Sequence, residues 1–204
     1  MENKIKIMEN KSAWYNDDVL PKDMINAATG KKWGFLEDSQ HFKVLDSFIK
    51  ELDFKNIADV GCGPGDLGRL YNNINYTGFD LEHIIEKVAK EVNPNLNYKY
   101  FDLNYDDYSE FKGFDLIICN GVLSEIKNPI NIISKILKNT DKYFLIHRQF
   151  FSSENSSLTY NTYGDLPTNR EIISLLEFKD LMINHKIEKQ ITNEWGDTVL
   201  IKRK

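Results

Sequence analysis

Asn56-Ile57-Ala58-Asp59-Val60-Gly61-Cys62-Gly63-Pro64-Gly65-Asp66-Leu67 is the stretch of this sequence that decides the fold. It begins with a short apolar run, residues 57–60, of the kind that forms a buried strand. Glycines follow at alternate positions, and Asp66 is placed to cap a helix that carries Leu67 and Leu70. A strand, a glycine turn and a helix in this order let the backbone approach a nucleotide-like ligand closely, because a Cβ atom there would collide with it.

The residues around these glycines exclude the commonest phosphate-binding loops. An ATP- or GTP-binding loop needs a Lys and a Ser or Thr directly after its glycines, and neither follows here. A dinucleotide-binding loop needs a third glycine where Asp66 stands. Asp59, shortly before Gly61, would place a negative charge beside a pyrophosphate. A carboxylate at this position suits a ligand that carries a cationic group and no phosphate.

Residues 59–67 resemble the first motif of class I S-adenosylmethionine-dependent methyltransferases, and later landmarks extend the resemblance from about residue 40 to the C-terminus. The methyl donor of this family has an ammonium, a sulfonium and no phosphate. The resemblance implies a doubly wound, three-layer α/β fold of the Rossmann-like methyltransferase type. Its sheet would be seven-stranded and mostly parallel, with a C-terminal antiparallel hairpin whose last strand lies between the fifth and the sixth.

Acidic and amide side chains are expected at the ends of the next strands. Asp80 closes a strand-like run, residues 76–81, about 20 residues beyond the first glycine, where α/β nucleotide binders place a ribose-binding carboxylate. The alternative role for Asp80 is to cap the helix that follows, and the two roles do not exclude each other. In the resembled family an acid and the next backbone amide contact adenine after the third strand. Asp102 and Leu103 match these positions, and a solvated acidic loop is the alternative.

Asn120 ends the most strand-like run of the chain, residues 114–120, whose continuous apolar character predicts a central parallel strand. Its backbone is expected to receive the ammonium of the cofactor. The segment that follows lacks the Asn/Asp-Pro-Pro-aromatic motif of amino-methylating DNA enzymes. The residues predicted to bind S-adenosylmethionine are Asp59, Gly61, Cys62, Gly63, Gly65, Asp80, Leu81, Asp102, Leu103 and Asn120.

The spacing of apolar residues and the positions of turn-forming residues predict the helices and strands of the remaining chain. Residues 39–52 and the segment from Pro129 onward carry apolar residues at helical spacing, and residues 96–101 and 143–146 are strand-like. Residues 152–168 show little regular pattern and predict a substrate loop. Thr168-x-x-Glu171 and Ser174-x-x-Glu177 both match the capping box, so a helix is expected to begin there. Residues 187–191 and 198–201 predict the terminal hairpin.

Catalytic residues are expected after the fifth strand, because ligands bind at the carboxyl ends of strands in open α/β sheets. Methyl transfer from a sulfonium is an in-line displacement, and a hydroxyl acceptor gains from a general base, for which histidine suits pH 7. Of the four histidines, His147 alone is predicted at such a strand end. Arg148 would hold an anionic group of the acceptor, and Tyr160 or Tyr163 would position it. A structural histidine and a surface ion pair are the alternatives.

Composition narrows the class further. The 204 residues carry a net charge of −5 and 41% hydrophobic residues, which fits one globular domain and gives no support for a nucleic-acid partner. Cys62 and Cys119 lack metal-ligand spacing, so buried thiols in a reducing compartment and no metal are expected. No apolar run is long enough to span a membrane, which predicts a cytoplasmic protein without a membrane partner.

Two parts are expected along the chain. Residues 39–204 would form the methyltransferase domain, and residues 1–38 a leader. Its aromatic residues, which include Trp14, Tyr15 and Trp33, would either form a lid over the active site or pin the leader to the core.

The acceptor is predicted from a second, fainter resemblance. Residues 144–150, 162–167 and 198–202 resemble methyltransferases of bacterial surface-polysaccharide gene clusters, which implies a hydroxyl of a sugar or of a polysaccharide precursor as the small-molecule acceptor. Two alternatives remain from the residues. One is a small NAD-dependent oxidoreductase, and the other is a catalytically silent methyltransferase-fold subunit that serves a partner.

Overall fold

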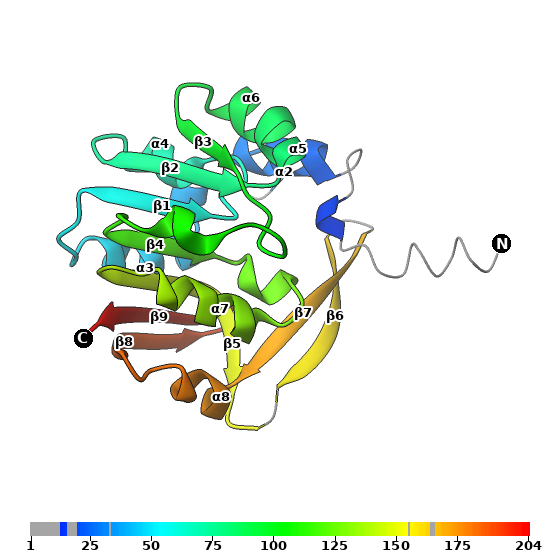
Figure 1. Cartoon of the computed structure of the whole chain (residues 1–204). Coiled ribbons are helices and arrows are strands. Elements are labelled where there is room, and N and C mark those ends of the chain that lie inside the picture. Colours follow the sequence, from blue (N-terminus) through cyan, green and yellow to red (C-terminus); the bar gives the residue numbers. More distant parts are fainter. Residues whose placement is uncertain (1–12, 16–19, 33, 155, 164–165) are drawn as a thin grey trace.

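A mixed β-sheet forms the centre of the molecule, seen here in a computed structural model (Figure 1). The structure describes residues 13–15, 20–32, 34–154, 156–163 and 166–204, and the side chains of Ala13 and of residues 160–169 lie outside that description. The main sheet has the strand order β3-β2-β1-β4-β5-β9-β8. Among the described helices, none is long and apolar enough to cross a membrane.

The first five strands of this sheet run parallel. They are β1 (Asn56–Val60), β2 (Asn75–Asp80), β3 (Asn97–Tyr100), β4 (Leu116–Asn120) and β5 (Tyr143–Ser152). The C-terminal hairpin of β8 (His185–Asn193) and β9 (Gly196–Arg203) is antiparallel, and β9 lies between β5 and β8. The predicted methyltransferase topology, with its last strand inserted beside the fifth, is confirmed.

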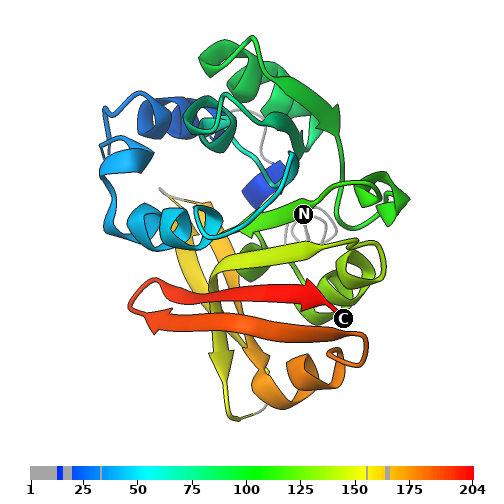
Figure 2. The ribbon, with the colours of Figure 1, turned by 90° about the vertical axis from the view of Figure 1, so that its left-hand side faces the viewer.

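Helices cover both faces of the sheet (Figure 2). On one face lie α3 (Gln40–Ile49) and α4 (Asp66–Leu70), and on the other α7 (Pro129–Lys138) and α8 (Leu175–Asp180). Because side chains alternate along a strand, Leu116 and Ile118 pack toward α3 while Ile117 and Cys119 pack toward α7. The central strands are therefore buried on both sides, as their continuous apolar runs predict.

Short helices occupy the connections. On the N-terminal side these are η1 (Ala13–Tyr15), α2 (Leu20–Ala28) and η2 (Leu36–Asp38). After β2 come α5 (Glu82–Ile84), the π-helical turn η3 (Ile85–Ala89) and α6 (Lys90–Val92). The 3₁₀ turns η4 (Tyr108–Phe111) and η5 (Leu123–Glu125) precede and follow β4. Leu20 and Met24 of the N-terminal segment pack with Ile84 and Val88 in a small core of their own.

The polar stretch after β5 differs from the prediction of an irregular loop. It forms a second hairpin, β6 (Ser157–Tyr163) and β7 (Leu166–Ser174), and the far end of β5 pairs parallel with β7. The predicted capping box at Thr168 is wrong because that residue lies within β7 and pairs with Asn161. The second one is confirmed, since Ser174 accepts a hydrogen bond from the Glu177 amide at the start of α8.

Candidate active site

A cavity of about 480 Å³ opens at the carboxyl ends of the parallel strands. Its walls come from the glycine loop after β1, the ends of β2, β3 and β4, Arg148 on β5, and the N-terminal elements η1 and α2. Nine of the predicted cofactor residues line it, namely Asp59, Gly61, Cys62, Gly63, Asp80, Leu81, Asp102, Leu103 and Asn120. Gly65 does not; it is the residue before α4, and its amide donates to the Cys62 carbonyl over 3.0 Å.

The glycine loop is held in the shape that the sequence predicts. Gly61, Gly63 and Gly65 all have positive φ angles, which residues with a Cβ rarely adopt. Asp80 fixes the loop to the end of β2, because its carboxylate accepts hydrogen bonds from the Gly63 and Leu81 amides, each 2.8 Å long. Burial of this carboxyl raises its pKa to about 6.

Asp59 is the most deeply placed acid of the cavity. Its residue is 2% exposed, and the Tyr76 hydroxyl donates a 2.8 Å hydrogen bond to Oδ2. Burial raises the pKa of Asp59 to about 7, and the nearby charge of Asp80 acts in the same direction. A cationic ligand would lower the pKa of Asp59 again, because a positive charge beside the carboxyl favours its ionised form. The donor set around the glycine loop therefore fits a ligand with an ammonium or a sulfonium.

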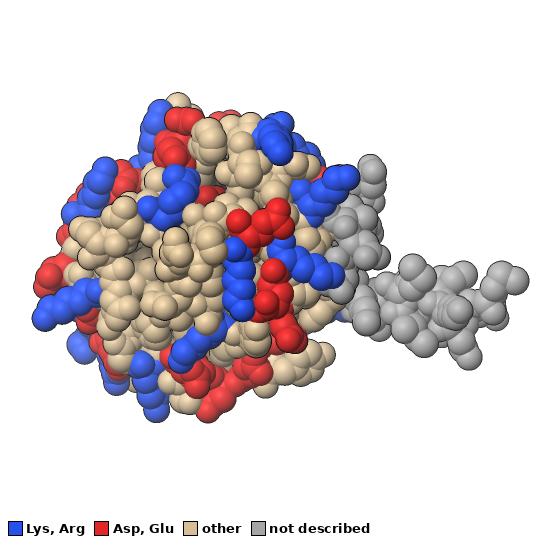
Figure 3. All heavy atoms as spheres, turned by 90° about the horizontal axis from the view of Figure 1, so that it is seen from above, with Lys and Arg blue, Asp and Glu red and all other residues tan. Residues whose placement is uncertain are grey.

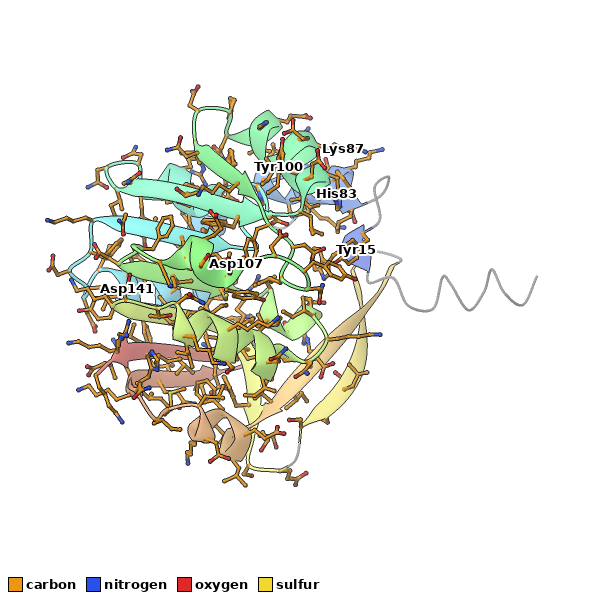
Figure 4. The ribbon with its side chains drawn as sticks, in the orientation of Figure 1. Tyr15, His83, Lys87, Tyr100, Asp107 and Asp141 are labelled. Atoms are coloured by element: carbon orange, nitrogen blue, oxygen red, sulfur yellow. The ribbon has the colours of Figure 1, made fainter. Side chains whose placement is uncertain are left out.

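The N-terminal segment reaches the predicted adenine end of the cavity. The Tyr15 hydroxyl donates to Asp102 Oδ2 over 2.8 Å and accepts a hydrogen bond from Asn104 Nδ2. His83 Nε2 donates to the Trp14 carbonyl over 2.9 Å, so η1 is attached at two points (Figure 4). Trp33 lies outside the described residues.

Arg148 lies on the cavity wall, where β5 changes partner. A bulge interrupts the pairing of β5 with β9 between His147 and Gln149, and Arg148 takes a left-handed conformation with φ of 60°. That conformation costs a residue with a Cβ about 1–2 kcal/mol. Arg148 Nε donates a 3.1 Å hydrogen bond to Asn120 Oδ1, which directs the guanidinium over the end of β4.

His147, the residue expected to act as base, lies behind the wall. It is 1% exposed, it does not line the cavity, and its Nδ1 hydrogen-bonds with Thr198 Oγ1 over 2.8 Å. Burial lowers the pKa of His147 to about 3. The expectation that β5 delivers His147 to the cleft is therefore wrong, because the bulge turns the next residue, Arg148, into the cavity instead. The side chains of Tyr160 and Tyr163 are outside the described part of the chain.

His41 is the cavity histidine that the sequence analysis missed, since it begins an amphipathic helix away from any strand end. It lies near the start of α3, and its ring centroid is 5.7 Å from that of His147. Burial, and then the charge of Arg148, lower its pKa to about 4. Its Nδ1 is buried without a hydrogen-bond partner among the described residues. Polar residues on nearby loops, Asn104, Glu125 and Lys127, also line the cavity.

Charged side chains of both signs are spread over the face of the molecule that Figure 3 shows. Lys and Arg residues are interspersed with Asp and Glu there, without a continuous basic stripe. Within the described ranges, no His, Cys, Asp and Glu side chains gather in a group that could hold a metal ion.

The strand order, the glycine loop and the acids at successive strand ends together define a class I S-adenosylmethionine-dependent methyltransferase. Residues 30–185 match the family model described as a methyltransferase domain, and the chain belongs to that family. The sequence prediction of this class is confirmed, and the NAD-dependent oxidoreductase is excluded as an alternative.

Two solved structures and one viral protein illustrate the similarity. The SAM-bound CalS10, an amino pentose methyltransferase of Micromonospora echinaspora, has a TM-score of 0.61 at 11% identity, with 83% of this chain and 94% of that chain covered. The N-terminal domain of EvdMO1, crystallised with SAH and D-fucose, has a TM-score of 0.58 at 14% identity, with 81% and 84% covered.

The viral protein is 235L of Invertebrate iridescent virus 6, which is named as a methyltransferase. It is 26% identical over 117 residues, which are 52% of this chain and 43% of the viral protein. This chain therefore matches less than half the length of that relative.

Proposed function

We propose that this protein transfers the methyl group of S-adenosylmethionine to a hydroxyl group of a small polar acceptor, a sugar or a sugar-derived polysaccharide precursor. The observation that carries the proposal is the composition of the cavity. Acids surround the glycine loop at its cofactor end, and polar side chains of each kind, the amide Asn104, the acid Glu125 and the base Lys127, line other parts of the wall. A hydroxyl-rich molecule needs several hydrogen-bond partners of this kind.

Similarity to sugar-modifying enzymes supports the acceptor class. CalS10 is described as an amino pentose methyltransferase, and the EvdMO1 domain was crystallised in the presence of D-fucose. Fold alone does not determine an acceptor. The sugar assignment therefore rests on these relatives together with the polar residues of a cavity wall that is otherwise largely apolar. The bacterial source and cytoplasmic location stay predictions.

His41 is the residue that we propose as the base. In the reaction the acceptor oxygen attacks the methyl carbon, sulfur leaves as a neutral thioether, and the hydroxyl proton needs an acceptor. The pKa of about 4 keeps His41 neutral at pH 7. Its Nδ1 is buried, so Nε2 is the ring nitrogen that we assign to the acceptor hydroxyl.

The acceptor class is tested by following S-adenosylhomocysteine release with matched acceptors. D-glucose and D-glucosamine differ in one hydroxyl and one amine, their nucleoside diphosphate derivatives add a charged handle, and catechol is a hydroxyl acceptor without a sugar. We expect turnover with the hydroxyl sugars or their nucleotide derivatives. Turnover of the amino sugars alone would contradict hydroxyl transfer, and turnover of catechol alone would contradict the sugar. Inactivity with all of them, together with tight association to another chain, would favour the silent subunit.

The base is tested with His41→Gln and His147→Asn. A general base typically contributes 10²–10⁴-fold, so we expect His41→Gln to lower kcat by roughly that factor while the Kd for S-adenosylmethionine stays near wild type. Because the pKa of His41 is lowered to about 4, wild-type turnover should stay level between pH 8 and 5 and fall only below. His147→Asn should keep most of the turnover. The reverse ranking of the two variants would restore His147 as the base.

A further inference from the structure

One charge of the cofactor has no partner among the residues predicted to bind it. S-adenosylmethionine carries a carboxylate on the same carbon atom as its ammonium, and none of the ten residues predicted to bind the cofactor is a Lys, Arg or His. An anion in a cavity with several acids needs a cation or strong hydrogen-bond donors. The cavity must therefore supply a residue that was not assigned to the cofactor.

The strand ends form a row along which the parts of the cofactor can be followed. Asp102 after β3, Asp80 on β2, the glycine loop after β1 and Asn120 on β4 follow the spatial order of the strands. Adenine, ribose and ammonium are assigned to Asp102, Asp80 and Asn120, and the glycine loop lies between the last two. The next strand in the row is β5, whose His147 pairs with Asn120, and the Gly121 amide donates to the His147 carbonyl over 2.9 Å. The end of the methionine part is therefore expected to reach β5.

Arg148 is the cation that β5 places there. Its Nε donates to the Asn120 side chain, so the guanidinium lies beside the strand end assigned to the ammonium. Two glycines make room for it. A Cβ atom on Gly121 would collide with the Arg148 guanidinium, and a Cβ atom on Gly196 would lie 3.0 Å from the Arg148 carbonyl carbon. The chain thus keeps an arginine in an unfavourable left-handed conformation and leaves space around it on both sides.

We propose that Arg148 binds the carboxylate of the methionine part of S-adenosylmethionine, and that the bulge in β5 exists to turn this side chain into the cofactor site. The proposal replaces the expectation that Arg148 holds an anionic group of the acceptor. A guanidinium suits the task because it stays charged and its donors match a carboxylate. Lys127 also lies on the cavity wall, but it follows η5 and is exposed, so it serves as the comparison.

Calorimetric titration with two ligands tests this without an acceptor. S-adenosylhomocysteine has the amino-acid part, and 5′-methylthioadenosine lacks it. Charge-assisted hydrogen bonds of this kind predict that Arg148→Gln weakens S-adenosylhomocysteine binding by roughly 10- to 100-fold. The affinity for 5′-methylthioadenosine should stay within about twofold of wild type, and Lys127→Gln should change neither value. Because no methyl transfer is measured, the outcome is independent of the proposed acceptor.

Arg148→Gly separates the ligand role from a structural one. Glycine adopts a positive φ readily, so the variant should fold with a Tm at or above that of wild type and should lose the same binding as Arg148→Gln. A variant that unfolds, or an equal loss of affinity for both ligands, would show that Arg148 supports the fold and would overturn the proposal. So would unchanged S-adenosylhomocysteine binding, or a carboxylate-specific loss in Lys127→Gln instead.

Discussion

Burial of Asp59 lowers the stability of the fold at neutral pH, although the same carboxylate is predicted to bind the cofactor. Its pKa rises to about 7 in the folded chain, whereas an unfolded aspartate keeps its ordinary value near 3.8. The folded state therefore holds the proton more tightly, and stability that is present below pH 4 is lost as the pH rises toward 7. Each unit of pKa shift corresponds to ~1.4 kcal/mol, so the loss is of order 4 kcal/mol at most.

We predict that Asp59→Asn stabilises the protein at pH 8 and weakens its binding of S-adenosylmethionine. Asparagine keeps an oxygen for the Tyr76 hydroxyl but carries no charge that must be desolvated. Chemical denaturation should give a free energy of unfolding about 1–3 kcal/mol higher at pH 8, with the gain vanishing near pH 4. Calorimetry should show the loss of affinity.

The matched control is Asp53→Asn, since the Asp53 side chain is 97% exposed. It should change neither the unfolding energy nor the affinity. A destabilised Asp59→Asn variant at pH 8 would contradict the stated cost of burying the carboxylate. Binding of the cofactor with wild-type affinity would contradict its role in binding.

At the scale of elements, the bulge in β5 explains why the acids of the cavity were predicted correctly and the position of His147 was not. Asp59, Asp80 and Asn120 lie in or at the ends of regular strands, where an apolar run followed by a polar residue fixes their position. His147 also ends an apolar run, but the irregularity after it depends on pairing with β9, some fifty residues later. No local pattern reports such a pairing, so the side chain that enters the cavity could not be deduced.

The β6–β7 hairpin was missed for a related reason. Its strands are rich in Ser, Thr, Asn and Tyr, and it lacks the strong apolar alternation that marks a half-buried strand. What makes it a strand pair is contact with the far end of β5, where Phe150 pairs with Ile172. Two features of the sequence could have indicated a hairpin. Polar residues alternate with Leu158 and Tyr160, and the Gly164-Asp165 pair is typical of a two-residue turn.

The attachment of η1 gives a prediction for the N-terminal leader. Tyr15→Phe removes the hydroxyl that joins Asp102 and Asn104, so η1 should open more often. Hydrogen bonds to charged groups contribute ~1.5–3 kcal/mol, so amide exchange around residue 15 should become at least tenfold faster while the Tm changes little. Tyr105→Phe, in an 83% exposed residue of the same loop as Asn104, is the control. Equal exchange in both variants would remove the support for a lid.

For the whole molecule, the fold could be predicted because two independent patterns agree. Apolar runs alternate with helical periods from residue 40 onward, and one glycine loop fixes which strand starts the nucleotide-binding half. Parallel strands with right-handed crossovers then leave few topologies. The positions of the N-terminal elements were not predictable in this way. Contacts distant in sequence hold them in place: α2 packs against α5 and η3, and Tyr15 of η1 hydrogen-bonds to Asp102.

The most direct test of the whole account is calorimetric titration of S-adenosylmethionine and NAD into wild type, Gly63→Val and Gly113→Val. Both glycines have positive φ angles, but Gly63 lines the cavity, whereas a Cβ atom on Gly113 would meet nothing within 4 Å. Both variants therefore place a valine at a positive φ angle, and only Gly63→Val also adds a side chain to the cavity wall. We predict one S-adenosylmethionine site in wild type and Gly113→Val, none in a folded Gly63→Val, and no heat with NAD. Tight binding of NAD without binding of S-adenosylmethionine would contradict the account.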